Sequence, residues 1–225
     1  MQKYQYSLDL LRQVIGKAPR FFPSGRKTDM LDALAKLERE PGTTPKMIDD
    51  AIIVFGREIW PYRQAFWHIH DTDGRHDEDL YLREALAPEL RAKYEAFLRK
   101  GLRVEDIRRG GEFEQYFSPV EKQALIDAKL LAHDRVVEGI ETLCAGEKKA
   151  ACDDALSRYR EEQKKIEALI AELSSLAAKS EKWRSEILDK VRTFQAGWSG
   201  LERGVAAEDV KGEIDYYSGV VEVLE

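Results

Sequence analysis

Apolar residues recur at alternating spacings of three and four in the second half of the sequence, and this pattern constrains the fold most strongly. The alternation runs without a slip for roughly six heptads, which is typical of a long helix with one apolar stripe. The stripe consists of Leu156, Tyr159, Gln163, Ile166, Ile170, Leu173, Ala177, Ser180, Arg184, Ile187, Val191, Phe194 and Trp198. We therefore predict one continuous helix over residues 149–198, about 75 Å long.

A helix with the same spacing precedes this one. Ser118 and Glu121 have the spacing of a capping box, with Pro119 at the first helical position. The seam of this helix consists of Ile126, Leu130, His133, Val137, Ile140 and Cys144. Residues 145–148 suffice for a tight reversal, so we predict a long antiparallel, coiled-coil-like helical hairpin. Its first arm is only about 40 Å long, so the distal half of the second arm needs a further cover: a C-terminal helix, the N-terminal helices or a second chain.

The rest of the chain also has helical periodicity. We expect an N-terminal helical bundle over residues 1–117, followed by the hairpin and a C-terminal return helix over 118–225, with no flexible linker between them. The clearest N-terminal helix begins at Pro45 after the N-cap Thr44. Its stripe consists of Ile48, Ile52, Phe55, Ile59, Tyr62, Phe66 and Ile69. A short helix is expected over residues 104–109. The fold class is therefore all-α.

Composition narrows the classes of function. Charged residues make up 35% of the 225 residues, which favours long solvent-facing helices. The formal net charge of −6 argues against a nucleic-acid-binding protein, which usually carries a basic face. The sequence has no apolar run long enough to span a bilayer, and residues 1–7 do not resemble a signal peptide. We expect a cytoplasmic protein that does not enter a membrane.

Histidines and carboxylates are concentrated in the connector after the Pro45 helix. Imidazole and carboxylate groups are the usual ligands of divalent transition metals. The candidate metal ligands are His68, His70, Asp73 and His76. A second interpretation is an exposed acidic loop whose carboxylates favour the N-terminus of the helix at Leu80.

Cys144 and Cys152 are the only cysteines, and they lie on either side of the predicted turn. Because the sequence shows no export signal, we expect two reduced, buried thiols; a disulfide across the turn is the alternative.

The width of the apolar stripe near the end of the long helix suggests a binding surface. The candidate interface residues are Trp183, Ile187, Val191, Phe194 and Trp198. We expect a non-enzymatic helical adaptor, scaffold or complex subunit that binds a protein partner or a second copy of itself. The alternative is a metal-dependent hydrolase or nuclease that uses the cluster at residues 68–79, with a divalent transition metal as cofactor.

Overall fold

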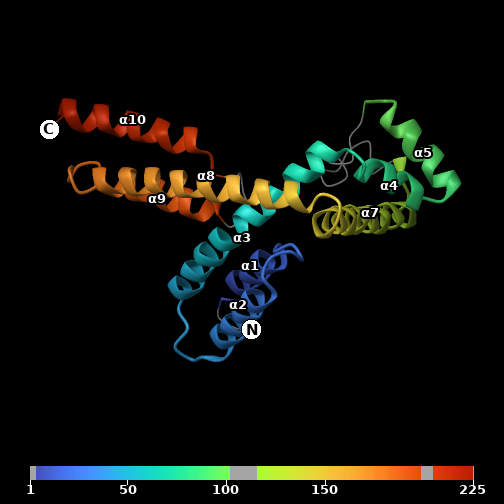
Figure 1. Cartoon of the computed structure of the whole chain (residues 1–225), viewed down its shortest axis with the longest axis horizontal. Coiled ribbons are helices and arrows are strands. Elements are labelled where there is room, and N and C mark those ends of the chain that lie inside the picture. Colours follow the sequence, from blue (N-terminus) through green and yellow to red (C-terminus); the bar gives the residue numbers. More distant parts are fainter. Residues whose placement is uncertain (1–3, 102–115, 199–204, 225) are drawn as a thin grey trace. The chain divides into compact units, whose positions relative to one another are not determined.

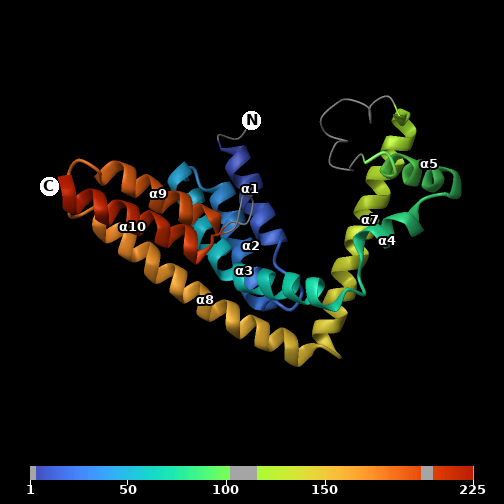
Figure 2. The same ribbon diagram turned by 90° about the horizontal axis from the view of Figure 1, so that it is seen from above.

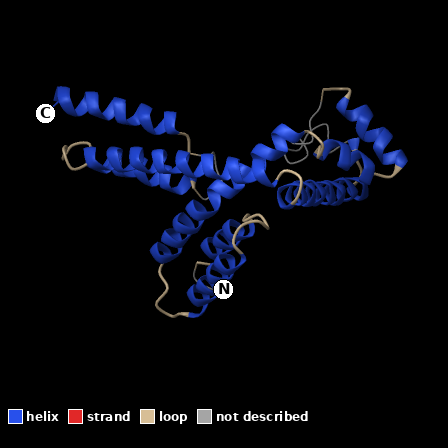
Figure 3. Ribbon diagram, in the orientation of Figure 1, coloured by secondary structure: helices blue, strands red, loops and turns tan. Residues whose placement is uncertain are grey.

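The structure of the chain is a computed structural model that describes residues 4–101, 116–198 and 205–224. The described residues form nine helices and no strand (Figure 3), which confirms the predicted all-α class. The short helix expected over residues 104–109 lies outside the described residues. The chain divides into a first unit, Met1–His68 with Glu147–Glu225, and a second unit, Ile69–Gly146. The predicted boundary after residue 117 lies inside the second unit.

The N-terminal part of the first unit consists of three helices: α1 (Gln5–Gly16), α2 (Ser24–Arg39) and α3 (Pro45–Asp73), the last as far as His68 (Figure 1). Thr44 accepts a hydrogen bond from the backbone N–H of Met47, as expected of an N-cap. The first four positions of the predicted α3 stripe are buried. The core consists of Leu8, Leu11, Val14, Ile15, Ala18, Phe22, Met30, Leu34, Ile48, Ile52, Phe55 and Ile59.

Three more helices complete the first unit: α8 (Lys149–Leu176), α9 (Arg184–Gly197) and α10 (Ala207–Leu224). They lie side by side (Figures 1 and 2). The predicted continuous helix over residues 149–198 is therefore wrong, because the chain turns between Leu176 and Arg184 and α9 runs back along α8. Buried Ser180 helps to form this turn, since its hydroxyl accepts a hydrogen bond from the backbone N–H of Trp183 at 3.3 Å.

The turn buries the apolar stripe within the unit. Ile187 and Val191 of α9 lie in one core with residues of α8 and α10, so the C-terminal helix is one of the covers that the stripe required. Trp60 of α3 joins this core and packs edge-on against Trp198, with ring centroids 5.1 Å apart. The core consists of Trp60, Ile166, Ile170, Leu173, Leu176, Ala177, Ile187, Val191, Trp198, Val205, Val210, Ile214 and Tyr217.

The second unit contains the end of α3, α4 (Glu78–Ala85), α5 (Pro88–Leu98) and α7 (Pro119–Ala145). The predicted capping box at the start of α7 is present: Ser118 accepts a hydrogen bond from the N–H of Glu121, and Glu121 accepts one from the N–H of Ser118. The core consists of Leu82, Leu86, Tyr94, Phe97, Phe117, Leu125, Ala128 and Ala132. The pairing of α7 with α8 in a hairpin stays a prediction, because the two helices belong to different units.

Candidate functional site

The four candidate metal ligands lie at the end of α3 and in the connector to α4. His70 Nδ1 lies 2.9 Å from a carboxylate oxygen of Asp71. Asp73 accepts hydrogen bonds from the guanidinium of Arg75 at 2.8 to 3.0 Å. His76 Nδ1 shares a 2.7 Å hydrogen bond with the hydroxyl of Tyr81. The side chain of His68 packs near the Tyr159 ring, at 6.2 Å between centroids.

These interactions do not form a metal-binding group. Within residues 4–101, 116–198 and 205–224, no three His, Cys, Asp or Glu side chains are arranged to hold an ion. The structure agrees with the other interpretation of this segment at Asp77, which is the N-cap of α4 and accepts a hydrogen bond from the N–H of Asp79 at 2.8 Å. Glu78 and Asp79 lie in the first turn, where negative charge is favourable. The metal site at His68, His70, Asp73 and His76 gains no support from the structure.

His76 has a structural contact that the sequence analysis did not anticipate. Its ring lies directly against Gly139 of α7, so that a methyl group at residue 139 would collide with the ring. Glycine in a helix interior lowers helix stability, and here its lack of a side chain permits the close approach of the connector. A glycine in the interior of the otherwise regular α7 was the sequence signal that could have predicted this close approach.

The predicted interface residues lie in the core of the first unit. Ile187, Val191 and Trp198 are buried, and Trp183 and Phe194 are partly buried against the same core. The covering side chains come from α8, α10 and α3. Ile187, Val191 and Trp198 therefore offer no exposed surface to a partner, whereas Trp183 and Phe194 remain partly exposed.

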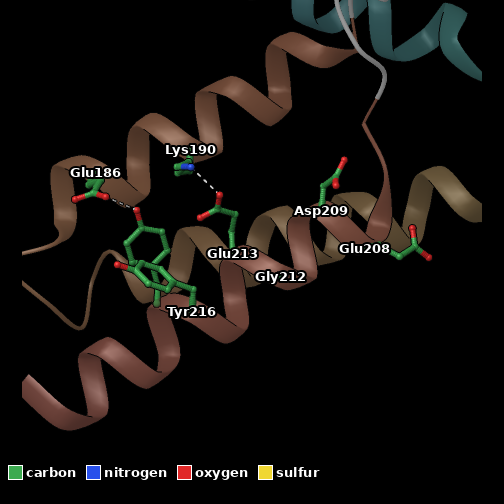
Figure 4. Close-up of a pocket in the computed structure, with 8 residues that line it drawn as sticks. Glu186, Lys190, Glu208, Asp209, Gly212, Glu213 and Tyr216 are labelled. Carbon is green, nitrogen blue, oxygen red and sulfur yellow. Dashed lines mark hydrogen bonds and ion pairs between the residues drawn. The ribbon is translucent and has the colours of Figure 1, made fainter.

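A groove between α9 and α10, with a volume of about 560 Å³, carries a concentration of charge. Figure 4 shows its lining, which includes four carboxylates, Lys190 and two tyrosines. Lys190 Nζ donates to Glu213 at 2.7 Å, and the hydroxyl of buried Tyr217 donates to Glu186 at 2.8 Å. Both hydrogen bonds connect α9 with α10.

The electrostatics of the groove follow from these contacts. Burial raises the pKa of Tyr217 and its hydrogen bond to Glu186 raises it further, while the pKa of Lys190 is raised by its hydrogen bond to Glu213. The other two carboxylates, Glu208 and Asp209, lie in the first turn of α10, where they complement the helix dipole. Helix packing therefore accounts for the charges of this groove.

The oxidation state of the two cysteines differs from the expected reduced thiols. Cys144 and Cys152 are both disulfide-bonded, and no described cysteine is free. The structure thus favours the alternative that the sequence left open.

Helix α7 carries two apolar stripes. The buried stripe, which the sequence analysis missed, contains Leu125, Ala128 and Ala132 and packs in the core of the second unit with Leu82 of α4. Its small alanines recur at the same three–four spacing and were the available signal. The predicted seam lies about 100° further around the helix, because each residue advances by that angle. The larger side chains of this second stripe had predicted that it would be the buried one.

The N-terminal part of the seam is exposed. We define the α7 seam as Gln123, Ile126, Leu130, His133 and Val137. The side chains of Ile126 and Leu130 are 44% and 61% exposed, although Ile140 and Cys144 further along are buried. Lys122 and Lys129 flank one edge of the α7 seam, and Asp127 and Asp134 flank the other. This arrangement, with Ile126, Leu130 and Val137 between a basic and an acidic edge, is typical of a helix that pairs with another helix.

Comparison of the chain with protein-family models, curated proteins and solved structures finds no match. In the part of the chain that the structure describes, no helix is both long enough and apolar enough to cross a membrane.

Proposed function

We propose that this chain is a non-enzymatic helical adaptor or complex subunit that binds protein through the α7 seam. The observation that carries the proposal is the second apolar stripe of α7, whose residues Ile126 and Leu130 are largely exposed. It replaces the surface predicted at residues 183–198, because Ile187, Val191 and Trp198 are buried and Trp183 and Phe194 are partly buried in the first unit.

The energetics favour a partner at this surface. Burying a leucine or isoleucine side chain contributes about 1.5–3 kcal/mol relative to full exposure. Single exposed apolar residues are normal on a protein surface. Ile126 and Leu130 differ from scattered residues because they are one helical turn apart on the same face and are continued by Val137. A partner that covers this row gains their contributions together.

No observation favours the alternative of a metal-dependent hydrolase or nuclease. Such a site needs several ligands that converge on one ion. The described residues contain no such group, and His70, Asp73 and His76 interact with Asp71, Arg75 and Tyr81 respectively.

A pair of variants on adjacent residues tests the proposal. Leu130→Glu places a charge in the α7 seam. Leu131→Glu places the same charge on the next residue, which is similarly exposed at 52% but lies off the seam. Each variant and the wild type are immobilised and exposed to a lysate of the source cell. We expect the wild type and Leu131→Glu to retain a protein that Leu130→Glu does not retain. Equal thermal unfolding of the two variants shows that both are folded. If the retained proteins are the same for both variants, the proposal is wrong.

A further inference from the structure

We infer that the α7 seam binds the α7 seam of a second copy of this chain, with the two helices parallel. This inference rests on the proposed function, because it names the partner of the same surface. Its evidence is the arrangement of charges on the two edges of the seam.

The seam has the positions of a short coiled coil. Counted in heptads, Gln123, Leu130 and Val137 occupy a positions, and Ile126 and His133 occupy d positions. The flanking residues then have defined places. Lys122 and Lys129 are g residues, immediately before an a position. Asp127 and Asp134 are e residues, immediately after a d position.

These charges distinguish parallel from antiparallel pairing. In a parallel pair, each g residue lies beside the e residue five positions later in the other helix. Lys129 therefore lies beside Asp134 of the second copy, and Lys122 beside Asp127 of the second copy; twofold symmetry repeats both pairs. In a symmetric antiparallel pair each edge meets its own copy, so lysines face lysines and aspartates face aspartates. The edges of α7 thus favour the parallel arrangement.

The other candidate to pack on the α7 seam is the apolar stripe of α8, but the residues of that stripe already pack within the first unit. Tyr159 packs edge-on against Trp60, with centroids 6.0 Å apart. Gln163 donates a hydrogen bond to the backbone carbonyl of Arg57 at 2.7 Å, and Ile166 is fully buried in the core. A second copy of the chain offers an identical exposed row, so that each copy covers the row of the other.

The interface we infer is short. It spans about two heptads, and its d position His133 is polar, which lowers stability while it restricts register. We therefore expect a weak dimer whose population increases with protein concentration.

Light scattering on the full chain over a series of concentrations tests the dimer. The mass of the wild type and of Leu131→Glu is expected to rise up to twofold, whereas Leu130→Glu stays at the monomer mass. A wild type that stays monomeric at every concentration overturns the inference. With a monomeric wild type, the proposed function still holds if Leu130→Glu abolishes the retention of another protein by the immobilised chain. If Leu130→Glu does not abolish that retention, the proposed function and the dimer are both wrong.

Two further pairs of variants test the parallel register. In a parallel pair residue 130 lies opposite its own copy, so Leu130→Cys is expected to form a covalent dimer on oxidation, and Leu131→Cys is not. Lys129→Glu places a glutamate beside Asp134 of the second copy and is expected to weaken the dimer; adding Asp134→Lys restores it. A dimer that forms with no cross-link at residue 130, or that Lys129→Glu strengthens, overturns the parallel arrangement.

Discussion

Two apolar stripes with the same spacing have different environments in this molecule. On α8 and α9 the stripe lies in a core that α10 and Trp60 complete. On α7 the predicted seam is exposed at Ile126 and Leu130, while a different stripe of the same helix is buried. The spacing of three and four thus indicates a helix with an apolar face, but it does not reveal what covers that face. The positions of the chain turns decide which helices pack on each apolar face.

The same substitution in the two stripes gives the largest expected difference. Ile187 is completely buried, so Ile187→Ala is expected to lower the free energy of unfolding by about 2–5 kcal/mol. Ile126→Ala removes the same atoms from an exposed position and is expected to lower it by less than about 1 kcal/mol. Chemical denaturation of both variants, at a low concentration where the wild type is monomeric, measures the difference. Equal losses would mean that another part of the chain covers the α7 seam, and the contrast between the stripes would then be wrong.

A glycine pair sharpens the contrast between contacted and open helix faces. Gly139→Ala is expected to lower the free energy of unfolding by about 1 kcal/mol, because overpacking against His76 exceeds the gain in helix propensity. Gly212→Ala in α10 is the matched control. No atom lies within 4 Å of a methyl group placed there, so this variant is expected to raise the free energy of unfolding by about 0.5–1 kcal/mol.

A double-variant cycle separates contact with His76 from any other effect at residue 139. In a His76→Ala background the ring is absent, and Gly139→Ala is expected to become stabilising. If it lowers stability by the same amount in both backgrounds, the ring is not the cause.

The sequence predicted the helices well and their connections less well. The start of α3, the capping box of α7 and the apolar face of α9 all follow from local patterns: caps, prolines and periodicity. The turn between Leu176 and Arg184 does not, because Ala177 and Ser180 are compatible with both a helix and a turn and the apolar spacing continues across it. A chain reversal that preserves the period leaves no interruption in the pattern.

The candidate sites also show that local sequence patterns do not predict which residues meet in space. The concentration of histidine and carboxylate at residues 68–79 is a property of the sequence, but metal binding requires convergence in space. In the structure His76 contacts Tyr81 and Gly139, and Asp77 caps α4. For α7 the seam was predicted from the larger side chains. The chain instead buries the stripe with Ala128 and Ala132, because small residues allow another helix to approach closely.

Removing the charge of Glu121 gives the smallest expected effect, and it tests whether local capping rather than packing defines where α7 begins. The pKa of Glu121 is lowered to about 2, first because Lys93 donates to its carboxylate and then because the N–H of Ser118 does. A carboxyl group whose pKa is lower in the folded chain stabilises it above the unfolded pKa of 4.5, and this contribution is lost as the pH falls towards about 2. Glu121→Gln is therefore expected to lower stability near neutral pH and to have almost no effect near pH 2, where the carboxyl group of the folded chain becomes protonated. The effect near neutral pH is slight, because solvent screens the charge of this exposed group. Ser118→Ala removes the other half of the capping box and is expected to cost about 1 kcal/mol at both pH values. Thermal unfolding of the two variants across this pH range measures both effects. A loss for Glu121→Gln that does not change with pH would show that its charge does not stabilise the start of α7.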